Sequence, residues 1–222
     1  MEAPHLLPME STVKVDGQLV RITNGGRQNA KAWFAYSRAD RADASMALAE
    51  VPMKYVGLKS SIDLVKEYLI QWSGDFCAIF GFSQGATFCH ILSMMAAAAR
   101  RDGVDPDTRS FAKIQCAILL SGFQSMHHDE LCANNPVTCS SDGDEEPVLA
   151  LKSLHIFGER DTSVPKGYGL KLAGCFANPM TYDHGKGHVI PSNADFCLKI
   201  ISFLDGVHNE DCNSTSRTEA IT

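Results

Sequence analysis

The sequence lacks the features of several large classes of protein. It has no basic excess, because 26 Asp and Glu outnumber 20 Lys and Arg and give a net charge of −6. Nucleic-acid-binding proteins usually present a basic surface. It has no internal repeat and no low-complexity segment, and it is not poor in hydrophobic residues (45%), as disordered chains are. We therefore expect a globular protein that does not bind nucleic acid.

Paired cysteines and a secretory signal are also missing. The eight cysteines include no CxxC pair, and most lie in apolar runs such as 76–80 and 115–119. A free cysteine in such a run behaves as a small hydrophobic residue, so we expect reduced, buried thiols. Residues 1–12 contain neither the basic nor the apolar region of a secretory signal. The expected location is the cytoplasm, with the nucleus as a second option.

Charged residues are absent between Phe76 and Ala99, which raises the question of a membrane span. A spanning helix needs about 20 mostly apolar residues. Here Gly81 and Gly85 interrupt the segment, and several polar residues lie within it. A strand, a tight turn and a buried helix fit this pattern better. We expect no membrane span.

Apolar runs typical of buried strands alternate with segments of helical periodicity. Such alternation indicates βαβ units and a mostly parallel sheet flanked by helices, so the predicted fold class is α/β. The predicted strands are 76–82, 113–123, 151–161 and 179–183, and the predicted helices are 45–71, 84–101, 166–176 and 192–205.

The length of 222 residues favours one medium domain with additions, which we place at residues 1–205. Residues 1–30 are rich in Pro, Gly and polar groups and are expected to be irregular, with a short edge strand at 18–22. Residues 125–147 are polar and are expected to form a loop. Residues 206–222 have too few apolar side chains to pack, so we expect a disordered tail.

A G-x-S-x-G motif, Gly81-Phe82-Ser83-Gln84-Gly85, lies between a predicted strand and a predicted helix. This context is what a nucleophile elbow requires, with glycines at 81 and 85 where a Cβ would crowd the strand and helix. The helix N-terminus directs backbone N–H groups at the serine, and the N–H of Gln84 is the natural oxyanion donor. An ordinary glycine-rich strand–helix turn is the alternative interpretation.

A reactive serine needs a base and an orienting carboxylate, which follow in the order Ser, Asp, His in hydrolases of this architecture. Asp161 ends a predicted strand, and His188 lies in a glycine-containing loop after the next one. Ser83, Asp161 and His188 are therefore the predicted catalytic residues. Glu159 is a rival carboxylate and His184 a rival base.

Two groups of residues invite a metal interpretation. His184 and His188 have helical spacing next to Asp183, but the glycines between them disfavour a helix. The second group lacks a paired half and is better explained as a polar surface loop; its members are His127, His128, Asp129 and Cys132. We expect no metal site. Phe82, Phe88 and Phe123 are candidates for lining an acyl pocket, although each fits a core role better.

Seven segments resemble, in order, the FSH-type serine hydrolases of the α/β-hydrolase superfamily. They are APHLLP (3–8), KAWF (31–34), GLKSSIDLVKEYL (57–69), GFSQGA (81–86), ILLSGF (118–123), SLHIFGERDTSVP (153–165) and HGKGHVIP (184–191). The resemblance implies an α/β-hydrolase-like fold and a triad of Ser83, Asp161 and His188. It also implies hydrolysis of small-molecule carboxylic esters or thioesters without metal or organic cofactor.

The chain departs from the family pattern at its start. Members begin with a strand, an oxyanion loop and a helix before the APH segment, and here the sequence opens at Met1-Glu2-Ala3-Pro4-His5. The resemblance then implies that strand 76–81 becomes a sheet edge and that one oxyanion donor is lost. Residues 24–29 only faintly echo that loop. The alternative function is a catalytically weakened or inactive hydrolase-derived binding protein, and the sequence does not indicate an oligomeric state.

Overall fold

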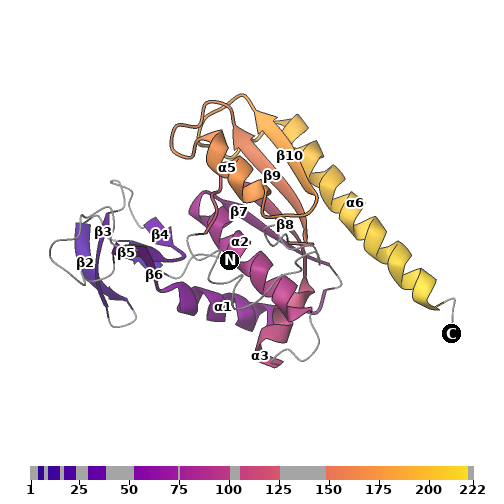
Figure 1. The fold of residues 1–222 in the computed structure, drawn as a ribbon, viewed down its shortest axis with the longest axis horizontal. Helices are drawn as coiled ribbons and strands as arrows, with labels where there is room; N and C mark the ends of the chain where they lie inside the picture. Colours follow the sequence, from indigo (N-terminus) through magenta and orange to yellow (C-terminus); the bar gives the residue numbers. More distant parts are fainter. Residues whose placement is uncertain are drawn as a thin grey trace, which may run out of the picture. The chain divides into compact units, whose positions relative to one another are not determined.

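The computed structural model describes residues 5–7, 10–15, 18–23, 30–38, 53–74, 76–100, 106–125 and 149–219 (Figure 1). The chain forms two compact units, Met1–Gln71 and Trp72–Thr222. The second unit contains all three residues of the predicted triad. The single domain expected over residues 1–205 stays a prediction.

The described residues of the first unit form three antiparallel strand pairs and a helix, α1. The pairs are β1 (His5–Leu7) with β4 (Ala30–Ala32), β2 (Glu10–Val15) with β3 (Gln18–Thr23), and β5 (Ala35–Arg38) with β6 (Met53–Val56). The edge strand predicted at 18–22 is therefore present as part of β3. The prediction of irregular structure for the rest of 1–30 is wrong for β1 and β2. In these two segments the backbone N–H and C=O groups are hydrogen-bonded to a partner strand.

Helix α1 (Leu58–Gln71) is shorter than the helix predicted over 45–71. Residues 53–56 form a strand instead, and Gly57 adopts a left-handed backbone conformation (φ 84°) between strand and helix. This strand pairs with β5, and the ring of Tyr55 lies 4.2 Å from that of Phe34, centroid to centroid. The buried residues Ser61, Val65 and Leu69 repeat every four positions along α1. Residues 45–50 lie outside the described part of the chain.

The second unit is built on a four-stranded parallel sheet (Figure 1). Its strands are β7 (Cys77–Phe82), β8 (Ile114–Leu120), β9 (Lys152–Gly158) and β10 (Pro179–His184), in the spatial order β10-β9-β8-β7. All three neighbouring pairs are parallel. The predicted α/β class with a parallel sheet is confirmed.

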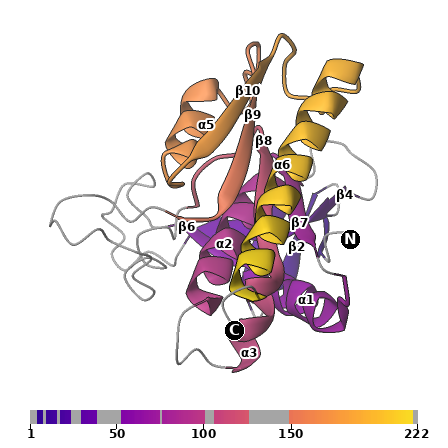
Figure 2. The ribbon, with the colours of Figure 1, turned by 90° about the vertical axis from the view of Figure 1, so that its right-hand side faces the viewer.

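Helices cover both faces of this sheet. Viewed along the sheet in Figure 2, α2 (Gln84–Ala99) and α5 (Lys166–Ala173) lie on one side and α6 (Ala194–Glu219) on the other. Alternate residues of β8 point to opposite faces of the sheet. On the face toward α6, Cys116, Ile118 and Leu120 pack in one cluster with Phe196 and Phe203. Between α2 and β8 lie α3 (Pro106–Arg109) and a 3-10 turn at Ser110–Lys113.

Helix α6 corrects the prediction of a disordered tail from residue 206. The helix continues to Glu219, and Val207 is buried in the same cluster as Phe196 and Phe203. These residues recur at intervals of seven and four, so they lie on one face of the helix. The low average hydrophobicity of the segment concealed this single apolar stripe.

Strand β7 is an edge of the sheet. Within the described part of the second unit it pairs with β8 alone, and the side chain of Phe80 is 45% exposed. The edge position expected for residues 76–81 is confirmed. An uncharged edge strand offers unpaired backbone groups to other chains.

Two further expectations concern cysteines and membranes. The described cysteines, at 77, 89, 116, 175 and 197, are free thiols, and burial raises the pKa of the Cys89 thiol to about 12. None of the helices in the described ranges has the length and apolar character needed to cross a bilayer. The loop expected at 125–147 lies almost wholly outside the described residues.

Candidate active site

Ser83 occupies a sharp turn between β7 and α2. Its backbone has φ 55° and ψ −120°, a conformation that residues with a Cβ rarely adopt. Gly81 permits this turn, because a Cβ there would lie 2.6 Å from the Ala86 nitrogen and still closer to the Gly85 carbonyl. The turn presents the half-buried Ser83 side chain at the carboxyl edge of the sheet.

Backbone hydrogen bonds hold this turn in place. The Ser83 N–H donates to the carbonyl of Leu120 in β8 (2.9 Å), and the Ser83 carbonyl accepts from the N–H groups of Ala86 (3.0 Å) and Thr87 (3.3 Å). Gln84 is the first residue of α2, so its backbone N–H lies in the first turn of the helix, next to Ser83. The positive end of the 16-residue helix dipole therefore lies beside Ser83.

Asp161 lies in the turn after β9. Its N–H donates to the carbonyl of Gly158 (3.1 Å), and its Oδ1 accepts from the N–H groups of Ser163 (2.9 Å) and Val164 (2.8 Å). The carboxylate side chain is fully buried. Burial raises the pKa of Asp161, but the hydrogen bond from the Val164 N–H and the interactions with His188 and Ser121 outweigh it and leave the pKa below its usual value. The carboxylate is thus a fixed negative charge.

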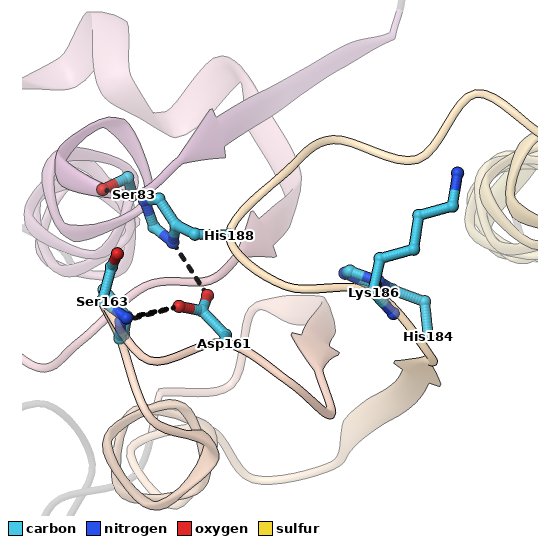
Figure 3. Close-up of polar contacts among 7 residues, drawn as sticks. Ser83, Asp161, Ser163, His184, Lys186 and His188 are labelled. Carbon is cyan, nitrogen blue, oxygen red and sulfur yellow. Dashed lines mark hydrogen bonds and ion pairs between the residues drawn. The ribbon is translucent and has the colours of Figure 1, made fainter.

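His188 lies in the loop between β10 and α6 and connects the other two residues (Figure 3). Its Nδ1 is 2.8 Å from Asp161 Oδ2, and its Nε2 is 3.1 Å from Ser83 Oγ. An ionised carboxylate only accepts, so Nδ1 carries the proton and Nε2 of the neutral ring is free to accept from the serine. The ring of Phe82 packs 4.7 Å from the imidazole, centroid to centroid. The three predicted catalytic residues are therefore brought together.

The loops that carry the acid and the base are hydrogen-bonded to each other. The backbone N–H of Glu159 donates to His184 O (2.9 Å), and that of Arg160 donates to Lys186 O (3.1 Å). The Arg160 side chain adds a bond from Nε to Gly185 O (2.8 Å). These contacts fix the turn holding Asp161 against the loop holding His188.

The rival residues lie apart from Ser83. Glu159 is exposed, and Asp161 is the residue that accepts the bond from His188. His184 is buried, and its Nδ1 accepts from the backbone N–H of Lys186 (3.3 Å). In Figure 3 His184 and Lys186 lie on the far side of Asp161 from Ser83, and the Lys186 side chain points away. Burial lowers the pKa of His184. The negative charge of Asp161 acts in the other direction and raises this pKa, but by less.

The metal and acyl-pocket candidates have mixed outcomes. Within the described ranges no cluster of His, Cys, Asp and Glu could hold a metal ion, and Asp183 pairs with Lys166 (2.7 Å). The second candidate cluster, at residues 127–132, lies outside the described residues. Phe88 is 2% exposed and belongs to the core, as its apolar setting predicted. The ring of Phe82 packs against that of His188, so this aromatic candidate does contact the triad.

Sequence reasoning missed the role of Ser121, the first residue after β8. It has φ 48° and is 3% exposed, and its hydroxyl contributes to the lowered pKa of Asp161 after the larger effects of burial, Val164 and His188. The resemblance includes the segment ILLSGF, which contains this serine. The signal that could have identified Ser121 is its place at the carboxyl end of a central strand, where the sites of such sheets form.

The fold and the site together define a serine hydrolase of the α/β-hydrolase class. The family model described as "Serine hydrolase (FSH1)" matches residues 1–200. The chain therefore belongs to the serine hydrolase (FSH1) family, as the resemblance implied.

Curated relatives agree with this assignment. Esterase OVCA2 of Danio rerio is 28% identical over 196 residues, which cover 86% of this chain and 75% of that protein. Esterase OVCA2 of Homo sapiens is 30% identical and that of Bos taurus 31%; each match covers 78% of this chain. The chain spans 66% of the length of these two relatives.

Among solved structures, the acyl-protein thioesterase 2 of Zea mays superposes with a TM-score of 0.52 at 16% identity. The match covers 79% of this chain and 72% of that one. At this level of identity the similarity supports the fold, which is the α/β-hydrolase fold expected from the sequence.

Proposed function

We propose that this protein hydrolyses carboxylic esters or thioesters of small molecules through an acyl-enzyme formed on Ser83. The observation that carries the proposal is the continuous hydrogen-bonded series from Ser83 Oγ to His188 and on to Asp161. A serine hydroxyl is a weak nucleophile, and a neutral imidazole at 3.1 Å is within the distance needed to take its proton.

In the first half-reaction, Ser83 Oγ attacks the acyl carbonyl while His188 Nε2 takes the hydroxyl proton. The carbonyl oxygen becomes an oxyanion, and the backbone N–H of Gln84 is our candidate for its donor. Collapse of this intermediate breaks the bond to the alcohol or thiol, which leaves with the proton returned by His188. The acyl group is then esterified to Ser83.

In the second half-reaction, His188 takes a proton from water, and the resulting hydroxide equivalent attacks the acyl carbonyl. The carboxylic acid leaves, and the proton returns from His188 to Ser83 Oγ. Asp161 keeps Nδ1 protonated and stabilises the imidazolium that forms in each half. Its lowered pKa, set by burial against stronger hydrogen bonds and the charge of His188, supports this role.

The substrate class rests on what related proteins are called. Curated relatives are named esterases, and a protein of the same fold is an acyl-protein thioesterase. Both names describe acyl transfer to water, which this mechanism accomplishes without metal or organic cofactor. A cytoplasmic or nuclear location belongs to the same proposal, and the free thiols among the described cysteines suit a reducing compartment.

The test is labelling with a fluorophosphonate probe, followed by turnover of p-nitrophenyl acetate and of an acyl thioester. The wild type should be labelled and turn over substrate, and Ser83→Ala should do neither. Ser73→Ala, which changes an exposed serine away from the site, is the matched control and should behave as wild type. Folded wild-type protein without Ser83-dependent labelling would refute the proposal and favour a hydrolase-derived binding protein.

A further inference from the structure

Ser121 has an uncommon backbone conformation for its residue type. Its φ of 48° is left-handed, which non-glycine residues occupy mainly where the surrounding structure enforces it. The Ser121 N–H donates to the carbonyl of Ile156 in β9 (2.9 Å). A Cβ on the next residue, Gly122, would lie 2.6 Å from that of Ala86 in α2. The chain is therefore held between β9 and α2 as it leaves β8.

The hydroxyl of Ser121 is buried. The residue is 3% exposed, and its Oγ has no partner that meets hydrogen-bond geometry. A buried hydroxyl without a partner is costly because it has lost its hydrogen bonds to water, so native proteins seldom keep one without a reason. A strained backbone and an unsatisfied hydroxyl at the same residue suggest that its position serves the adjacent site.

The Asp161 carboxylate has room for one more donor. Two backbone N–H groups occupy Oδ1 and His188 occupies Oδ2, whereas a carboxylate accepts about four hydrogen bonds. Strands β8 and β9 are parallel neighbours with Leu120 opposite Ile156, so Ser121 and Asp161 both follow the carboxyl ends of adjacent strands. Burial raises the pKa of Asp161, and the Ser121 hydroxyl is among the groups that more than offset this effect.

We propose that Ser121 is a positioning residue whose hydroxyl donates the fourth hydrogen bond to Asp161 and fixes the plane in which that carboxylate orients His188. This inference rests on the proposed function, because Ser121 reaches the substrate only through Asp161 and His188. It assigns a role to the buried serine and explains why its strained backbone is kept.

The experiment compares Ser121→Ala with Ser121→Gly. Both remove the hydroxyl, but only glycine relieves the left-handed strain, so glycine should give the higher Tm. Both should lower kcat for p-nitrophenyl acetate about tenfold, with little change in KM, because a hydrogen bond to a charged group is lost. Ser93→Ala is the matched control: it removes another buried hydroxyl, which donates to Cys89 O at 2.8 Å in α2, and should change only Tm.

The pH dependence separates positioning from a structural role. Without the serine donor, more negative charge on Asp161 faces His188, so the acid limb of kcat/KM should move to higher pH in both variants. His184 also interacts with Asp161, and the charges of Lys186, Asp183 and Glu159 act on His184 in turn. Residue-assigned NMR titration of the His188 ring therefore gives its pKa directly, and it requires no activity.

An unchanged or lowered His188 pKa in both variants would overturn the inference, as would a glycine variant with full kcat. The NMR result stands even if wild-type protein shows neither labelling nor turnover, so a failure of the proposed function is recognised separately. If wild type is active and both variants match it in kcat and acid limb, only the role of Ser121 is wrong.

Discussion

Replacing Asp161 by Asn tests the hydrogen-bond arrangement of the site most directly. Oδ1 accepts from two backbone N–H groups, Ser163 and Val164, at 2.9 and 2.8 Å. An asparagine at 161 must place its side-chain carbonyl oxygen at the position of Oδ1, because its NH2 group cannot accept hydrogen bonds from these two N–H groups. The NH2 group then faces His188 Nδ1, which becomes an acceptor.

That reversal moves the imidazole proton to Nε2, where it points at Ser83 and prevents the ring from taking the serine proton. In serine enzymes with this arrangement, the corresponding change lowers kcat about 10⁴-fold, or about 5 kcal/mol of transition-state stabilisation. We expect a loss of this size for Asp161→Asn at neutral pH, with KM nearly unchanged.

The assay is steady-state hydrolysis of p-nitrophenyl acetate, with circular dichroism to confirm folding. Asp183→Asn is the matched control, since it removes a half-exposed ion pair with Lys166 and should change kcat less than twofold. A loss below tenfold in folded Asp161→Asn would refute the reasoning, because the carboxylate would then not select the tautomer.

Three further predictions concern the elbow, the helix and a buried histidine. Gly81→Ala should slow fluorophosphonate labelling of Ser83 about 10²-fold, because the added Cβ displaces the turn, and unchanged labelling would contradict this. Val207→Ala should lower the unfolding free energy by about 1–3 kcal/mol in urea, whereas Leu198→Ala, 62% exposed on the same helix, should change it by less than about 0.5 kcal/mol; equal effects would disprove the packing of α6. Burial lowers the pKa of His155 to about 4, so below pH 6.5 the unfolded chain binds a proton that the native protein does not, and stability falls toward pH 4. His155→Gln should weaken this fall in urea unfolding at several pH values, and an identical pH dependence would count against it.

Much of the second unit could be predicted from the sequence. Unbroken apolar runs identify β7, β8 and β9 as strands, and β8 and β9 are buried as that pattern predicts, whereas β7 is an edge strand with exposed side chains. The G-x-S-x-G motif places Ser83 between strand and helix. Asp161 and His188 follow because catalytic side chains gather at the carboxyl ends of parallel strands. The order Ser, Asp, His along the chain and the position of each residue after a predicted strand were sufficient to select these residues as candidates.

The sequence favoured Asp161 and His188 over their close rivals, Glu159 and His184, without a physical reason that excludes the rivals. Glu159 and Asp161 both follow β9 and are only two residues apart. The bond from the Asp161 N–H to Gly158 O belongs to the turn that directs Asp161, and not Glu159, toward His188. The same holds for His184, which ends β10, and His188, which follows it in the loop. Such choices depend on the hydrogen bonds of a turn, which residue type and spacing do not reveal.

Ser121 and Val207 were missed for different reasons. A left-handed serine has no sequence signature, because Gly and Asn are the residues that usually announce this conformation. Val207 lies in a polar segment where average composition predicts disorder, yet one apolar face is enough to extend a helix along an existing core.

The bonds between the turn after β9 and the loop after β10 have a consequence for evolution and for engineering. Arg160 links them through both its backbone and its side chain. An insertion or deletion in either segment would move the general base relative to its carboxylate, even without altering a catalytic side chain. Changes of length there are tolerable only as matched pairs, so diversification of the substrate range has more freedom in segments that carry no such cross-link.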